Sequence, residues 1–441
     1  MRSKRTLLPL LLLAALLLSA CAGNAGTPAG EGPAASAQPS PDHTVITFSG
    51  SEVQILGGGA RDEGDAVVIS AAGTYEVTGV SQDKALIVDT GDDAMDVTLI
   101  LNNAEIASLT GPALHIRQAK HFRLQLAAGS VSRLTSGTEE QAQAASPDAS
   151  GAALYSEDDM DIEGEGRLIV CGYLNNGIGC KDDLDINSGE IVVVAVNNGV
   201  KGNDSVQIKG GSLTVTAWGD GVKSSTADKA GKGAVEISGG SVRIECWGDG
   251  IQAATQLRVT GGELSVKAQG QGDEQSSKAL KAGGDIALEG GQISLESQED
   301  GLRSETGSVR LCGASLEILA AGDGIQAGEK GSGLGDVVLE SGTVRIDAGK
   351  QAVKARGSFT VTGGSLTALC GSGKQAGPEG ELPWLLCPIA GSAGDEIAAG
   401  DLPALTARRD FSCLLLADGA LPRGEVLPVS CGTAQIEAQV R

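Results

Sequence analysis

Apolar and polar residues alternate along most of the chain, and the alternation recurs as a repeated unit. The unit reads apolar-x-apolar-x-Gly-Gly-x-apolar-x-apolar-x-apolar, then Asp or Asn, Gly and an apolar residue. It is clearest at 206–222 (VQIKGGSLTVTAWGDGV) and 235–251 (VEISGGSVRIECWGDGI), with weaker copies at 184–200, 257–269 and 359–371. A period of two is typical of strands that bury one face, so the pattern predicts strands and no helices.

The apolar residue after the glycine serves as a reference position, which we call the anchor. The anchors are Leu86, Leu114, Leu154, Ile178, Val200, Val222, Ile251, Leu280, Leu302, Ile325 and Val353. From Ile178 to Val353, three spacings are 22 residues, one is 23 and three are 28 or 29. The longer spacings carry the polar, Gly-rich inserts 225–233, 270–277 and 328–335, which we expect to leave the repeat near one corner.

This period predicts an all-β fold, a right-handed single-stranded parallel β-helix with turns of about 22 residues. No helical stretch follows the strand, which excludes a leucine-rich repeat, and the unit is too short for a propeller blade. The Gly-Gly pair suits a tight corner with positive φ. We expect the β-helix over 44–375, with opening cap strands in 44–80 and a C-terminal β cap over 376–441, where the repeat is lost.

The first residues indicate export. Arg2, Lys4 and Arg5 precede an apolar run from Leu7 to Leu18 that is too short to span a bilayer. The following Leu-Ser-Ala-Cys resembles the lipobox of bacterial lipoproteins, which implies a signal peptide over 1–21 and lipidation of Cys21. An ordinary secretory signal with a chance cysteine is the alternative. Residues 22–43 are rich in Gly, Ala, Pro and Ser and predict a disordered linker.

A lipid at Cys21 would place the protein on the extracellular face of the cell membrane, with the lipid as its only membrane contact. The net charge is −23, from 56 acidic and 33 basic residues. This balance excludes a nucleic-acid partner, which would require the opposite sign. Among the other eight cysteines, Cys246 and Cys370 stand at apolar positions of the repeat, so we expect buried thiols there. Cys387, Cys413 and Cys431 are left undecided.

Carboxylates recur at fixed distances from the anchors. Four residues past an anchor stand Asp158, Asp182 and Asp204, and one residue further stand Asp159 and Asp183. Equal positions stack at strand spacing in a parallel β-helix, so these charges repel unless a cation lies between them. Carboxylate oxygens suit Ca²⁺, and calcium is therefore the predicted cofactor.

A second polar column stands two residues before the anchors. It contains Asn176, Asn198, Asp220, Asp249, Asp300 and Asp323, interrupted by Lys278. Asp220 and Asp249 are further candidate calcium ligands. The alternative, which we weigh equally, is that short polar side chains simply suit the corner turn.

Two tryptophans and a basic column complete the candidates. Trp218 and Trp247 both stand four residues before an anchor, and the alternation points them outward, where sugar rings could stack on them. Packing under an insert is the alternative. One residue past the anchors stand Lys201, Lys223, Lys281, Arg303 and Lys354. Of these, Lys201 and Lys223 are candidate sugar contacts, or a base for a lyase.

Several segments in order resemble a known family. They are 74–108, ALYSEDDMDIEGEGRLIV (153–170), GIGCKDDLDINSGEIVV (177–193), GVKGNDSVQIKGG (199–211) and GDGIQAATQLRVTGG (248–262). They resemble the bacterial carbohydrate-binding domain-containing β-helix family of cellulolytic and gut clostridia. The resemblance implies a polysaccharide-lyase-like β-helix, bound calcium, and binding of cellulose or pectin-type sugar without catalysis. The paired aspartates of that pattern are here Asn175-Asn176 and Asn197-Asn198.

The sequence thus predicts a cell-surface protein that binds acidic, pectin-type or cellulosic polysaccharide with calcium. No histidine lies in the regular turns from Ile178 to Val353, since only His43, His115 and His121 exist, so a histidine-based triad is not expected. The alternative function is a calcium-dependent pectate or polysaccharide lyase, which would use a lysine or arginine base.

Overall fold

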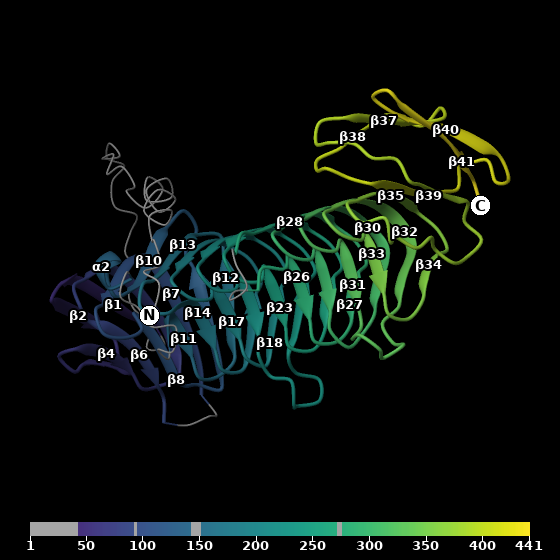
Figure 1. The fold of residues 1–441 in the computed structure, drawn as a ribbon. Coiled ribbons are helices and arrows are strands. Elements are labelled where there is room, and N and C mark those ends of the chain that lie inside the picture. The colour runs from purple at the N-terminus through teal and green to yellow at the C-terminus, as the bar shows by residue number, and fades with distance from the viewer. Residues whose placement is uncertain (1–42, 92–94, 143–150, 271–275) are drawn as a thin grey trace, which may run out of the picture.

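The computed structural model describes residues 43–91, 95–142, 151–270 and 276–441. The predicted signal peptide, Cys21 and nearly all of the predicted linker lie outside these residues. The regular secondary structure of the described part is almost entirely strand, and it forms a long solenoid with a separate C-terminal cap (Figure 1). Its helix, α2 (Glu139–Ala142), is four residues long, and no helix among the described residues could cross a membrane.

Each turn of the solenoid contributes strands to three faces. The first face carries the anchors, and its strands are β4 (Ala66–Ile69), β6 (Ala85–Asp89), β8 (Leu114–Gln118), β11 (Ala152–Ser156), β14 (Asn176–Cys180), β17 (Val200–Gly202), β20 (Val222–Ser224), β23 (Ile251–Ala253), β26 (Leu280–Ala282), β29 (Leu302–Ser304), β31 (Ile325–Ala327) and β33 (Val353–Ala355). The antiparallel β3 (Ala60–Asp62) closes its N-terminal edge.

The second face follows the first in each turn. Its strands are β9 (His121–Leu126), β12 (Met160–Gly164), β15 (Asp183–Ile186), β18 (Ser205–Ile208), β21 (Ala234–Ile237), β24 (Leu257–Val259), β27 (Ile286–Leu288) and β34 (Phe359–Val361). The third face comes next, with β10 (Val131–Ser136), β13 (Arg167–Gly172), β16 (Glu190–Ala195), β19 (Ser212–Ala217), β22 (Ser241–Cys246), β25 (Glu263–Ala268), β28 (Gln292–Ser297) and β35 (Ser365–Cys370). Four longer strands, β5 (Gly73–Ser81), β7 (Asp96–Ser108), β30 (Val309–Ala320) and β32 (Val337–Ala348), run through both of these faces.

The predicted fold class and register are confirmed. All neighbouring turns pair in parallel, and the eleven anchors are aligned with one another, from Leu86 opposite Leu114 to Ile325 opposite Val353. The anchors are almost fully buried in one continuous core. The second glycine of each Gly-Gly corner has positive φ, for example +76° at Gly211 and +80° at Gly240, which only glycine adopts at low cost.

The inserts differ from the prediction. Residues 225–233 and 328–335 follow first-face strands, but Gly270, which opens the insert 270–277, follows β25 on the third face and so marks a different corner; residues 271–275 lie outside the described residues. That expectation of a single corner was wrong because two of the three corners tolerate extra residues. The insert 270–277 begins beside Trp247, since a Cβ on Gly270 would lie 2.3 Å from the carbonyl oxygen of Trp247.

Both ends of the solenoid are covered. At the N-terminus, β1 (His43–Gly50) pairs with β5 in parallel and with β2 (Glu52–Leu56) in antiparallel orientation. At the C-terminus, β39 (Cys413–Asp418) pairs antiparallel with both β35 and β36 (Trp384–Cys387). The rest of the cap is a small antiparallel sheet of β37 (Glu396–Ala399), β38 (Leu405–Thr406), β40 (Val426–Cys431) and β41 (Ala434–Gln439), with its own core.

Arg408 fastens this cap to the third face. Its Nε lies 2.8 Å from Asp347 Oδ2 and one terminal nitrogen lies 3.0 Å from Glu317, while its backbone N–H donates to Asp347 Oδ1 at 3.0 Å. Its other terminal nitrogen donates to the carbonyl of Ile318. The Asp347 side chain is 1% exposed, so the cap supplies most of the solvation that this carboxylate needs.

Candidate functional site

Trp218 and Trp247 lie side by side at the corner between the third and first faces. The last residues of β19 and β22, Ala217 and Cys246, are aligned and buried, so the next residue in each turn points outward. The two indoles stack with ring centroids 4.4 Å apart and an angle of 25° between their planes. Both side chains are half-buried, so the predicted outward orientation agrees with the structure.

The tryptophans belong to a longer column on this corner. The backbone N–H of Trp218 donates to the carbonyl of Ala195, the last third-face strand residue one turn back, and those of Trp247, Val196 and Gln269 make the equivalent hydrogen bond. Tyr173 occupies the same position one turn before Val196. The column is therefore Tyr173, Val196, Trp218, Trp247, Gln269, a strip of flat or apolar groups along the solenoid axis. Sequence reasoning missed the outer members, although each stands directly after the last inward residue of its strand.

Stacking limits how a sugar could contact the pair. One ring face of each indole is covered by the other indole. A sugar could therefore contact only the ring edges, the face of Trp218 toward Val196 and the face of Trp247 toward Gln269. Such an arrangement offers a ridge of aromatic edges and amides rather than two separate flat platforms. A sugar chain lying along the solenoid axis would follow this ridge.

The first acidic column is partly neutralised by the 225–233 insert. Lys232 Nζ lies 2.8 Å from Asp183 Oδ2 and 3.5 Å from Asp204 Oδ2, and Lys229 Nζ lies 3.8 Å from Asp204 Oδ1. Burial raises the pKa of Asp204, but the Thr226 hydroxyl and these ammonium groups outweigh it, so the pKa lies below its ordinary value. The insert thus brings cations to two carboxylates that the sequence assigns to calcium.

Asp182 is the acidic residue at which like charges converge. Desolvation raises the pKa of Asp182, and the carboxylates of Asp159, Asp204 and Asp158 raise it further. Asp158 and Asp159 have partners of their own, because Asp158 Oδ2 accepts the Ala119 N–H at 2.8 Å and Asp159 Oδ1 accepts the Asp183 N–H at 3.1 Å.

These side chains do not converge as metal ligands do. Over the described ranges, no three His, Cys, Asp or Glu side chains are grouped so that they could hold a metal ion. Lysine ammonium groups take the places beside Asp183 and Asp204 that a calcium ion would need. The arrangement therefore does not fit a calcium ion at Asp183 and Asp204. For the other carboxylates of the column, calcium stays a prediction.

Removing the charge of Asp182 separates the two possibilities. Because its folded pKa is raised, Asp182 contributes stability below its unfolded pKa and loses it as the pH rises through the folded value. Without calcium, Asp182→Asn should raise the unfolding free energy at pH 7 by up to about 1 kcal/mol, and the gain should vanish in acid.

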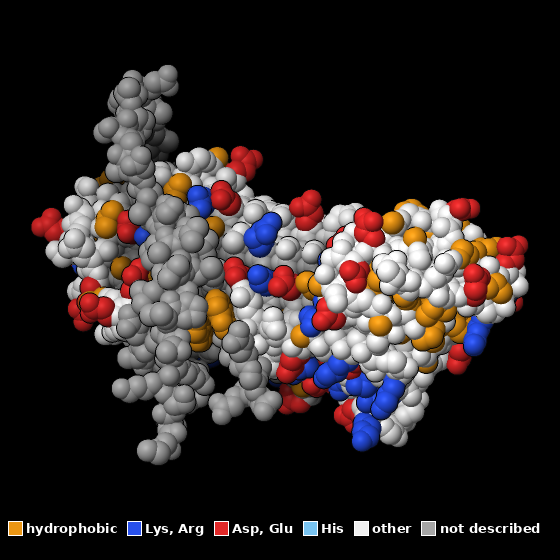
Figure 2. Space-filling view, turned by 45° about the horizontal axis from the view of Figure 1, so that its top comes forward, with side chains coloured by type: hydrophobic (Ala, Val, Ile, Leu, Met, Phe, Trp, Pro, Cys, Tyr) orange, Lys and Arg blue, Asp and Glu red, His pale blue; other side chains and the backbone are white. Residues whose placement is uncertain are grey.

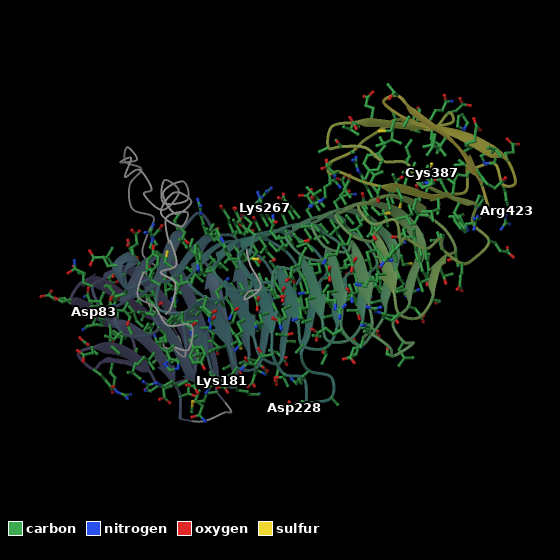
Figure 3. All side chains as sticks on the ribbon, viewed as in Figure 1. Asp83, Lys181, Asp228, Lys267, Cys387 and Arg423 are labelled. Atoms are coloured by element: carbon green, nitrogen blue, oxygen red, sulfur yellow. The ribbon has the colours of Figure 1, made fainter. Side chains whose placement is uncertain are left out.

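With calcium bound there, the same substitution should lower the melting temperature and abolish the effect of EDTA. Thermal unfolding at pH 7 and pH 3, with calcium or with EDTA, measures this. Asp228→Asn, on the exposed part of the insert, is the matched charge control (Figure 3). Identical melting of wild type and Asp182→Asn under all four conditions would contradict both accounts.

The second polar column forms a ladder of side-chain to backbone hydrogen bonds. Asp220 Oδ1 accepts the Asp249 N–H at 2.8 Å, and Asp249 Oδ1 accepts the Lys278 N–H at 2.9 Å. Asn176 and Asn198 make the same contact one turn on. These contacts match the alternative that short polar residues suit the corner. Asp249 is 1% exposed, and desolvation followed by the Asp220 charge raises its pKa.

The basic column lies on the outside of the first face, in the register predicted. Lys223 Nζ lies 2.7 Å from Asp220 Oδ2 and 3.0 Å from Gln252 Oε1. Lys201 has Asn198 in place of that aspartate, and no ion pair is formed by Lys201 within the described part of the chain. Desolvation, followed by the Lys223 charge, lowers the pKa of Lys201. Figure 2 shows basic and acidic side chains interspersed along the solenoid surface in view.

Comparison with known proteins places this geometry in a family. The family described as "Carbohydrate-binding domain-containing protein" matches residues 63–311 and 306–395. The chain belongs to this family. These two matches cover the solenoid from its first turns and extend into the cap, so the strip and the acidic columns lie within the shared region of the family.

One relative of this family member is a "Carbohydrate-binding domain-containing protein" of Acetivibrio thermocellus. It is 32% identical over 129 residues, which is 29% of this chain and 45% of the relative. The match thus spans less than half of that relative's length. A solved structure, a polysaccharide lyase-like protein from C. thermocellum studied as a gadolinium derivative, matches with a TM-score of 0.44 and 25% identity over 66% of this chain and 99% of its own.

Proposed function

We propose that this family member binds polysaccharide along the corner strip of Tyr173, Val196, Trp218, Trp247 and Gln269. The observation that carries the proposal is the half-buried, stacked Trp218–Trp247 pair in register with further flat groups. Membership of the carbohydrate-binding domain-containing family supports it. The equal spacing of turns suits a regular polymer, because each turn presents the same position ~4.8 Å further along the axis.

We also propose the finer points that the sequence predicts. The ligand is an acidic, pectin-type chain or a cellulosic chain, and the protein is held at the cell surface through a lipid on Cys21. The lipobox-like Leu-Ser-Ala-Cys supports the anchor. Calcium dependence is kept as a prediction that the EDTA experiment decides, since lysines already contact Asp183 and Asp204.

Removal of the two indoles tests the strip. The double variant Trp218→Ala, Trp247→Ala should bind polygalacturonate or cellulose about tenfold more weakly or worse, because buried aromatic side chains dominate such interfaces. Leu334→Ala, which removes an exposed apolar side chain on a distant insert, should bind as wild type does. Sedimentation with insoluble polymer and titration with oligosaccharides measure the change, and unfolding curves check the fold.

The same incubation distinguishes binding from cleavage. A lyase would produce unsaturated sugars that absorb in the ultraviolet, and Lys201→Ala or Lys223→Ala would then reduce the product. Binding without such product supports the proposal. Undiminished binding by the double tryptophan variant would move the site away from this corner.

A further inference from the structure

An open cavity of about 590 Å³ lies where the cap meets the solenoid. Its walls come from both parts. Leu319, Gly349 and Gly371 belong to the solenoid, and residues 408–412 of the cap lie across from them. Figure 1 shows the cap folded back over this end of the solenoid, and in Figure 3 it stands on the side from which Lys267 of the third face projects.

The two arginines in this cavity differ in their contacts. Each nitrogen of the Arg408 guanidinium donates to one solenoid acceptor, namely Asp347, Glu317 or the Ile318 carbonyl, so it holds the segment in place. Arg409, the next residue, is half-buried, and within the residues that the structure covers it forms no ion pair with a carboxylate. The Arg408 contacts therefore fix the backbone from which a cation without an acidic partner extends into the cavity.

The floor beneath Arg409 is free of side chains. A Cβ placed on Gly349 would lie 3.2 Å from a terminal nitrogen of Arg409 and 2.3 Å from the carbonyl oxygen of Ala321. A Cβ on Gly371 would lie 2.2 Å from the carbonyl oxygen of Gly349. Backbone packing thus requires glycine at both positions, and the result is a flat floor close to the guanidinium.

One acidic side chain also lines this cavity. Asp410 is exposed, and its Oδ1 accepts the Ala393 N–H at 3.0 Å. That hydrogen bond directs the carboxylate to the cap backbone. Ser412, whose hydroxyl donates to the Cys370 carbonyl at 3.3 Å, and Phe411, whose ring is buried in the cap core, complete the lining. The cavity therefore combines a cation, a hydroxyl and a glycine floor, which suits one sugar ring that carries an anionic group.

The cavity and the tryptophan strip share one column. After Gln269, the same corner position is taken by Gln298, Ala321, Gly349 and Gly371, each with its N–H bonded one turn back. From Trp247 to Gly349 is four turns, or roughly 19 Å at ~4.8 Å per turn. A polymer that follows the strip toward the C-terminus therefore arrives at Arg409.

We propose that this cavity binds a carboxylate-bearing sugar residue of the polysaccharide, with the carboxylate paired to Arg409; this rests on the proposed function. A guanidinium can hold a carboxylate through two parallel hydrogen bonds. The protein carries a net charge of −23, so an acidic polymer is repelled overall and needs a local cation to be held. Arg409 supplies that cation without a metal ion.

Binding of two matched oligosaccharides tests the inference. Oligogalacturonate and its fully methyl-esterified form are titrated in EDTA against wild type, Arg409→Ala and Arg409→Gln. Both variants should bind the free acid about tenfold more weakly or worse, because a charge-assisted contact is lost, and should bind the ester as wild type does. Arg423→Ala, an exposed arginine elsewhere on the cap, is the matched control.

The outcomes separate this inference from the proposed function. Equal affinity of wild type and the Arg409 variants for the free acid overturns the inference, while loss of both ligands in the double tryptophan variant still supports the strip. A sulfated oligosaccharide that binds through Arg409 more tightly than the uronate overturns the choice of carboxylate. Absence of binding of either galacturonate form to the wild type overturns both for pectin-type ligands.

Discussion

Oxidation of Cys370 and Cys413 to a disulfide is expected to raise the free energy of unfolding of the capped end by about 4 kcal/mol. The two residues are direct partners in the antiparallel pairing of β35 with β39, both are buried, and their Sγ atoms lie 3.0 Å apart. They are 43 residues apart in the chain, and a link across such a loop restricts the unfolded chain strongly. Sequence analysis predicted that Cys370 is buried, which the structure confirms, but left Cys413 undecided.

The chemistry favours this pair over the other thiols. Contact with the Cys370 thiol lowers the pKa of Cys413, while the same contact raises that of Cys370. Cys413 is thus the more readily deprotonated of the two thiols, and an oxidant such as glutathione disulfide would accept the two electrons of disulfide formation. All eight cysteines from Cys171 to Cys431 are free in the described chain.

Unfolding with and without a reductant measures the effect. Wild type exported to an oxidising compartment should melt at a lower temperature once dithiothreitol is added, whereas Cys413→Ser should not respond to it. Cys246→Ser is the control, since that buried thiol has no cysteine beside it. Full alkylation of both thiols in the denatured, exported protein would rule the disulfide out.

Replacing Arg408 by alanine should weaken the docking of the cap by about 3 kcal/mol, because it removes the main partner of a buried carboxylate. Asp347 would keep the backbone N–H of residue 408, but its only charged partner among the described residues would be Arg345, whose Nε lies 3.2 Å away. Glu317 and the Ile318 carbonyl would lose their contacts as well. The expected result is a separate, early unfolding transition for residues of the cap while the solenoid stays folded.

Hydrogen exchange of the cap strands together with chemical unfolding reports this change. Arg310→Ala is the matched control, because Arg310 makes two hydrogen bonds to Glu340 on the exposed surface and should matter little. Unchanged exchange in β37 and β40 would show that cap docking depends on the β35–β39 pairing alone.

The solenoid could be read from the sequence because its determinants are local. Every anchor is an apolar residue that follows a glycine or an alanine, and burial of that residue fixes the register of its turn. The alternation then determines which side chains point outward, so the positions of Trp218, Trp247 and the basic column followed directly. These features depend on residues within one turn or on the equivalent residue of the next.

The remaining features depend on contacts that cross the repeat. Lys232 reaches Asp183 over 49 residues, and nothing in the spacing of the aspartates indicates that an insert supplies the cation. Arg408 and Arg409 lie in a segment without a repeat, so their approach to Asp347 and Gly349 has no sequence signal. For Asp220 and Asp249 the sequence favoured calcium ligands and corner residues equally. The backbone N–H groups that donate to these two side chains favour the corner role, and their direction could not be known from the sequence.

The uniform geometry of the corners has a consequence for how this protein can evolve. Each turn meets its neighbours through the same backbone register, so an in-frame duplication or loss of 22 codons would leave both flanking turns compatible. Such an event would change the distance between Trp247 and the cap by ~4.8 Å without altering either end. Relatives can therefore differ in the distance between the corner strip and the cap while keeping the same side chains at both.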